Sequence, residues 1–185
     1  MHRRPLLDLV AAYARRFPAE EAVAARFADF VRTHSDCFER ACVPGHVTGS
    51  AWLVSHDRAE FLLTHHRKLG RWLQLGGHAD GDTDAARVAL REASEESGIV
   101  GLSLAAIDGR VQPFDLDAHE IPARPGEPAH VHYDVRFLVI APPGARLALS
   151  GESLALRWFR ADAPLAVEHD ESVARLAAKA RALVA

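Results

Sequence analysis

The chain has 185 residues, of which 49% are hydrophobic and 25% charged, and its formal net charge is −3. This length suits one domain with an added segment, and the composition is that of a globular protein with a hydrophobic core. The net charge does not favour nucleic acid or an anionic membrane as a partner, and no apolar run reaches the ~20 residues that span a bilayer. Cys37 and Cys42 are too few for a disulfide framework, so we interpret them as reduced thiols of a cytoplasmic protein.

The N-terminal part of the chain is predicted to be helical. Apolar residues recur near helical spacing over residues 5–36, and Pro18 interrupts the run. The stretch VPGHVTGS, residues 43–50, is rich in turn-forming residues and separates this part from the rest of the chain. We therefore expect a helical extension over residues 1–44 and a second unit over residues 45–185.

The second unit is predicted to contain strands and two helices, over residues 84–97 and 171–184. Asp82 and Thr83 offer N-cap oxygens to the first of these helices, and Gly98 is a natural left-handed stop. The expected strands and their turns cover residues 50–55, 60–66, 69–77, 102–107, 119–123, 130–141 and 155–160. This order indicates an α+β domain with helices packed on a mixed sheet.

Three acidic residues gather near the end of the first of these helices. At 100° per residue, Glu92, Glu95 and Glu96 leave the helix within one sector of about 100°. Like charges three and four positions apart destabilise an isolated helix. The stripe is therefore either a solvated face or a site where carboxylates hold Mg²⁺ or Mn²⁺, which prefer oxygen ligands.

The sequence around these glutamates is a second signal. In GGHADGDTDAARVALREASEESGI, the residues that recur at a fixed spacing are Gly77, Arg91, Glu92, Glu95, Glu96, Gly98 and Ile99. With these residues, the segment over residues 77–99 resembles the Nudix box, the signature of the Nudix hydrolases. Two positions depart from the Nudix pattern: Ala93 is small for an aliphatic position, and Thr83 occupies the position of an early glutamate. Either Thr83 caps the helix and the early acid is lost, or the turn is one residue shorter and Asp82 supplies the acid.

The resemblance implies a fold, a reaction and roles for individual residues. It implies an α/β/α sandwich over about residues 45–185, and a hydrolase that cleaves the pyrophosphate linkage of a nucleoside diphosphate joined to another group, with Mg²⁺ or Mn²⁺. Glu95 and Glu96 are then the core metal ligands. Glu92 orients or deprotonates the attacking water, or joins the metal shell. The backbone carbonyl of Gly77 is a further ligand, and Arg91 braces the glutamates by ion pairs.

The resemblance does not cover the helical extension. We expect the extension to cap the sheet, to cover the cleft or to form the contact of a homodimer.

Residues outside the motif are also candidates. A later acid serves as base or extra ligand in many Nudix hydrolases, and Glu152 is the candidate here, unless it is a solvated loop residue. His78 lies near the expected phosphate site. Arg67 and Lys68 carry positive charge that can hold phosphates, unless they mark an exposed strand end.

His130, His132 and Asp134 alternate along a predicted strand, so they point to one face. They line the substrate cleft, make structural hydrogen bonds or bind zinc. A zinc hydrolase built on these residues is therefore an alternative to the pyrophosphohydrolase. A catalytically weak Nudix domain that binds a nucleotide as a sensor is another.

Overall fold

The computed structural model describes residues 2–184, over which the chain forms four α-helices, one short 3₁₀ helix and an eight-stranded mixed sheet. The helices are α1 (Arg4–Arg16), α2 (Glu21–Thr33), α3 (Ala85–Ser97) and α4 (Glu171–Val184), and the 3₁₀ helix is η1 (Pro18–Glu20). The strands are β1 (Gly45–Val54), β2 (Glu60–His66), β3 (Trp72–Leu73), β4 (Leu75–His78), β5 (Ser103–Leu104), β6 (Asp115–Ile121), β7 (His130–Ile140) and β8 (Ser153–Arg160). The predicted α+β class and the helical N-terminal extension are confirmed.

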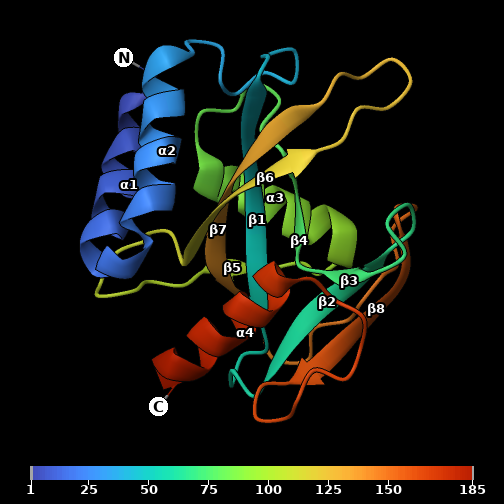
Figure 1. Ribbon diagram of the computed structural model, residues 1–185. Coiled ribbons are helices and arrows are strands. Elements are labelled where there is room, and N and C mark those ends of the chain that lie inside the picture. Colours follow the sequence, from blue (N-terminus) through green and yellow to red (C-terminus); the bar gives the residue numbers. More distant parts are fainter. Residues whose placement is uncertain (1, 185) are drawn as a thin grey trace.

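Strand β1 is the centre of the sheet (Figure 1). It runs parallel to β7 over its whole length, while β4 and β2 pair antiparallel along its other edge. The far edge of β7 pairs with β6 and then with β5. Helix α3 lies behind the sheet and α4 in front of it in Figure 1, so helices cover both faces.

Strand β1 begins earlier than predicted, at residue 45 instead of 50, within the turn-rich stretch. Its small and polar residues suit a central strand that packs against a helix on one face and borders a cleft on the other. A Cβ on Gly49 would lie 2.8 Å from the carbonyl oxygen of Ala85 and 2.9 Å from the side chain of Val88, so glycine lets α3 pack directly on β1. On the opposite face, the polar side chains of Thr48 and Ser50 are buried in the wall of a cleft.

Two other strands also differ from the prediction. Of the segment predicted as a strand over residues 102–107, Ser103 and Leu104 pair in register with β7, and Ala105 adds one backbone hydrogen bond to Leu138. Strand β6 occupies the rest of that edge of β7. Strand β6 begins at Asp115, before the predicted residue 119. Aspartate is rare in strands, but Asp115 and Asp117 both receive hydrogen bonds from the buried guanidinium of Arg136.

The helical extension packs against the domain instead of projecting from it. The ring of Phe30 in α2 stacks on Tyr133 of β7 with ring centroids 3.8 Å apart. A polar contact adds to this packing, because Lys179 of α4 donates hydrogen bonds to Glu20, at 2.8 Å, and to Asp115, at 2.6 Å. The extension, the sheet and α4 are thus held together at one buried point.

None of the helices over residues 2–184 has the length and hydrophobicity needed to cross a bilayer. Cys37 and Cys42 are buried free thiols.

Candidate active site

A cleft of about 410 Å³ opens on the face of the sheet that carries Thr48 and Ser50. Carboxylates, histidines and basic side chains all contribute to its lining. Its ionisable residues are Arg40, His66, Lys68, His78, Glu92, Glu96, His119, Arg124, Glu127, His130, His132, Asp134 and Glu152.

Helix α3 presents two of its three clustered glutamates to the cleft. Glu92 and Glu96 line it, whereas the side chain of Glu95 is 61% exposed and points to Arg91. The Nη1 atom of Arg91 lies 2.7 Å from Glu92 and 3.4 Å from Glu95, and Nη2 donates to the carbonyl oxygen of His78 at 3.0 Å. Arg91 therefore braces the glutamates and ties α3 to β4.

The double glycine of β4 makes room for these carboxylates. A Cβ on Gly77 would overlap the carboxylate of Glu92, and one on Gly76 would overlap the hydroxyl of Ser50. Gly77 is therefore needed for the close approach of Glu92 to the strand backbone.

Glu96 is the most perturbed acid of the cleft. Burial, and then the negative charges of Glu92 and Glu152, raise the pKa of Glu96 to about 8. Burial also raises the pKa of Glu92. Oε2 of Glu96 is buried and has no hydrogen-bond partner among residues 2–184. A buried oxygen without a donor, beside two further carboxylates, fits a divalent cation with hard oxygen ligands.

Glu152 reaches the cleft from the turn before β8, and Arg67 holds that turn. The guanidinium of Arg67 donates to the carbonyl oxygens of Gly151, at 3.0 Å, and Ser153, at 3.1 Å. The guanidinium of Arg67 therefore binds the backbone on either side of Glu152, whereas its neighbour Lys68 lines the cleft.

Two basic residues that line the cleft were not predicted from the sequence. Arg40 comes from the segment between α2 and β1, where it pairs with Asp80, and Arg124 comes from the connection between β6 and β7. Neither belongs to a motif, and only the folded chain brings them to the cleft.

The start of α3 differs from the sequence prediction. Its N-cap is Asp84, whose carboxylate accepts hydrogen bonds from the backbone N–H groups of Ala86 and Arg87. Asp82 instead accepts from the N–H of Asp84 and pairs with Arg87. Thr83 therefore does not cap the helix, and the carboxylate of Asp82 is occupied outside the cleft.

The end of α3 follows the prediction. Gly98 adopts the left-handed conformation that was predicted for it, with φ 68°.

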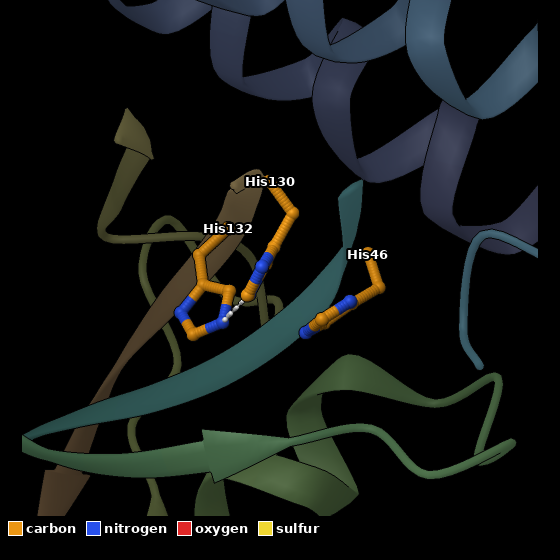
Figure 2. A group of neighbouring side chains, drawn as sticks. All are labelled: His46, His130 and His132. Carbon is orange, nitrogen blue, oxygen red and sulfur yellow. Dashed lines mark hydrogen bonds between the residues drawn. The ribbon is translucent and has the colours of Figure 1, made fainter. Parts of the chain in front are cut away.

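Several histidines form a cluster, of which His78, His130 and His132 also line the cleft. His132 pairs in register with His46 across β1 and β7, and with His119 across β6 and β7. His46 was not singled out from the sequence, yet one ring nitrogen from each of His46, His130 and His132 lies within 4.8 Å of the other two (Figure 2). His78 joins them, with its ring centroid 5.0 Å from those of His46 and His132.

Asp134 does not belong to this histidine cluster. Its carboxylate accepts hydrogen bonds from Thr48 at 2.9 Å, Ser50 at 2.8 Å and Arg136 at 2.7 Å. These donors occupy its oxygens, so Asp134 shapes the cleft wall and is not available beside His130 and His132.

A family model described as NUDIX domain matches residues 46–179 of the chain. The chain belongs to the Nudix family. Membership of this family makes it a pyrophosphohydrolase that acts on phosphoanhydride bonds, and Nudix hydrolases generally use divalent metals. No curated protein matches the sequence.

Solved Nudix structures share the fold. A Nudix-family hydrolase from Clostridium perfringens is 24% identical, with a TM-score of 0.60, and the match covers 76% of this chain and 98% of that one. An Ap4A hydrolase from C. elegans, in a binary complex, is 17% identical, with a TM-score of 0.60 and coverages of 75% and 96%. The Nudix domain of Shewanella oneidensis NrtR, in complex with ADP ribose, is 16% identical, with a TM-score of 0.53 and coverages of 75% and 88%.

Proposed function

We propose that this Nudix protein hydrolyses the pyrophosphate linkage of a nucleoside diphosphate joined to another group, with Mg²⁺ or Mn²⁺ held by Glu92, Glu96 and Glu152. The observation that carries the proposal is the buried, unpartnered oxygen of Glu96 beside two other carboxylates. When bound, a divalent cation neutralises phosphate oxygens, stabilises the transition state and activates water. Gly77 lies against the carboxylate of Glu92, and its backbone carbonyl is the proposed further ligand.

The remaining charges of the cleft suit the rest of such a substrate. Lys68, Arg40 and Arg124 line the cleft together with the carboxylates, so these cations would offset the charge of a phosphate group bound there. Burial lowers the pKa values of His78 and His132, so both rings are neutral where they line the cleft, and His78 offers one hydrogen-bond donor and one acceptor to the substrate.

Glu95 and Glu96 of α3 lie in different surroundings, so a substitution at each of them tests the metal assignment. Glu96→Gln keeps the size of the side chain and removes its charge, so we expect at least a hundredfold loss of kcat with Mg²⁺ and no loss of melting temperature. Glu95→Gln is the matched comparison on the same helix. We expect it to keep most of the activity, because the Glu95 carboxylate points to solvent and Arg91. Near-normal activity in folded Glu96→Gln would overturn the assignment, and a hundredfold loss in Glu95→Gln would add Glu95 to the metal ligands.

A substrate panel tests the reaction itself. ADP-ribose, nucleotide sugars, dinucleoside polyphosphates and nucleoside triphosphates are incubated with the protein and Mg²⁺, and phosphate-containing products are measured. Binding of one of these nucleotides without turnover would favour the sensor function instead.

A further inference from the structure

We infer that His46, His130 and His132 form a second metal site, which binds a transition metal of borderline softness such as Zn²⁺. This site is separate from the carboxylate site on α3, and its existence does not depend on the proposed reaction. All three side chains project from β1 and β7 into one space, as Figure 2 shows.

The register of the sheet creates this group. His46 and His132 are direct partners across the parallel strands β1 and β7, and His130 lies two residues before His132 on the same face of β7. The backbone of two central strands thus fixes the positions of the three histidines, so metal binding would need to order their side chains only slightly.

The spacing of the nitrogens suits tetrahedral coordination. Nε2 of His130 lies 3.2 Å from Nε2 of His132. In a tetrahedral site with zinc–nitrogen distances near 2.0–2.1 Å, two ligand nitrogens are about 3.3 Å apart. The nitrogen of His46 within 4.8 Å of both needs only a modest side-chain movement to complete the set.

The tautomer of His130 also suits a ligand. Its Nδ1 lies 2.9 Å from the carbonyl oxygen of Pro128, which can only accept, so Nδ1 carries the hydrogen and Nε2 presents a lone pair. A hydrogen bond from the second ring nitrogen to a backbone carbonyl is the usual orienting contact of metal-binding histidines.

His46 supplies an independent observation. Its side chain is buried, with 3% exposure, yet neither ring nitrogen has a hydrogen-bond partner within the described part of the chain. The hydrogen bond between His130 and His132 satisfies that pair but leaves His46 without a contact. Leaving a buried polar nitrogen unpaired costs free energy, and a cation shared with His130 and His132 would remove that cost for His46.

The surroundings indicate what completes the coordination. Oε1 of Glu127 lies 3.8 Å from Nε2 of His130 and is the nearest carboxylate to that ring, so it is the candidate fourth ligand. His130 and His132 line the cleft, so a metal held here also faces the substrate space. Neutral imidazoles select Zn²⁺ and related metals, whereas Mg²⁺ prefers oxygen ligands.

The test uses this difference in selectivity. Zn²⁺ is titrated into the full chain in competition with a chromophoric chelator, with millimolar Mg²⁺ present to occupy carboxylate sites. We expect one Zn²⁺ per chain, and at least about a tenfold weaker affinity in His46→Gln and in His132→Gln. Two controls are expected to keep the wild-type zinc affinity: His56→Gln, which removes an exposed histidine of the turn after β1, and Glu96→Gln, which removes the carboxylate site.

Co²⁺ provides a measurement on the wild-type protein that needs no variant. With Mg²⁺ present, a tetrahedral histidine site gives strong visible absorption, whereas an octahedral oxygen site absorbs weakly. Weak absorption, or equal zinc affinity in wild type and both histidine variants, would overturn the proposal. Loss of zinc binding in Glu96→Gln would show instead that zinc occupies the carboxylate site. Should His46→Gln fail to fold, His132→Gln and the Co²⁺ spectrum decide.

Discussion

At the scale of single residues, the start of α3 shows how local competition selects one cap from three adjacent candidates. Asp82, Thr83 and Asp84 all carry a side-chain oxygen that suits an N-cap. Asp84 takes the position because Asp82 already accepts from the N–H of Asp84 and pairs with Arg87, which shapes the turn before the helix. The residue that matches the early slot of the motif, Thr83, is left without a capping bond.

The cap can be tested by removing each candidate oxygen in turn. Asp84→Ala removes the acceptor for two backbone N–H groups, so we expect the free energy of unfolding to fall by about 1 kcal/mol. Thr83→Ala should leave the unfolding free energy unchanged. Urea unfolding of both variants measures the difference, and the reverse order would mean that Thr83 caps the helix in solution.

At the scale of elements, the contact between α3 and β1 determines where the glutamates lie. Gly49 has no side chain between β1 and the first turn of α3, so the helix packs closely on the strand. Gly76 and Gly77 leave room for the groups that face them, Ser50 and Glu92. Three glycines on two paired strands therefore set the depth at which the carboxylates enter the cleft.

Adding one methyl group at this contact tests the packing. Gly49→Ala puts a Cβ within 3 Å of Ala85 and Val88, so we expect the unfolding free energy to fall by roughly 2 kcal/mol. Gly151→Ala is the control, because a Cβ there has no neighbour within 4 Å. Denaturant unfolding measures both, and an equal effect of the two changes would contradict close packing at Gly49.

At the scale of the whole molecule, a buried ionic cluster joins parts of the chain that are far apart in sequence. Asp115 of β6 receives hydrogen bonds from Arg136 of β7, Arg175 of α4 and Lys179 of α4. Lys179 also contacts Glu20, so the helical extension depends on the same cluster. We therefore expect the extension, the sheet and α4 to unfold together.

Lys179→Met tests this cluster. Lysine at this position is largely buried, and its loss removes the cation that pairs with Glu20 and one of the three cations that pair with Asp115, so we expect the unfolding free energy at neutral pH to fall by about 3 kcal/mol. Arg160→Met is the control, because it removes an exposed ion pair with Asp162 and should change stability little.

The same variant has an expected pH dependence. Burial raises the pKa of Asp115, but Arg175, Arg136 and Lys179 outweigh burial and lower its pKa below the usual value. A lowered folded pKa stabilises the protein above the unfolded value of about 4, and this contribution is lost as the pH falls. The stability difference between wild type and Lys179→Met should therefore persist from pH 7 down to about pH 4 and shrink below it, as the pH falls through the lowered folded pKa of Asp115. A constant difference would mean that the charge of Asp115 is not involved.

Regular local patterns made much of the fold predictable from the sequence. The period of apolar residues predicted α1, α2, α3 and α4, and the alternation and turn residues predicted β2, β7 and β8 to within a few residues. Gly98 could be identified as the end of α3 because a left-handed C-terminal residue is a local feature that glycine adopts readily. The spacing of the box residues led to the Nudix family.

Only the tertiary structure decided which side chains meet. His46 lies 84 residues from His130, and nothing in the chain between them specifies that β1 and β7 run parallel in this register. The same is true of Arg40 and Glu152 at the cleft, and of the exposure of Glu95. The physical reason is that helix and strand periods describe which residues share a face of one element. Strand partners, register and helix depth depend on packing across the whole molecule, as in the cleft that Glu92, Glu96 and Glu152 share.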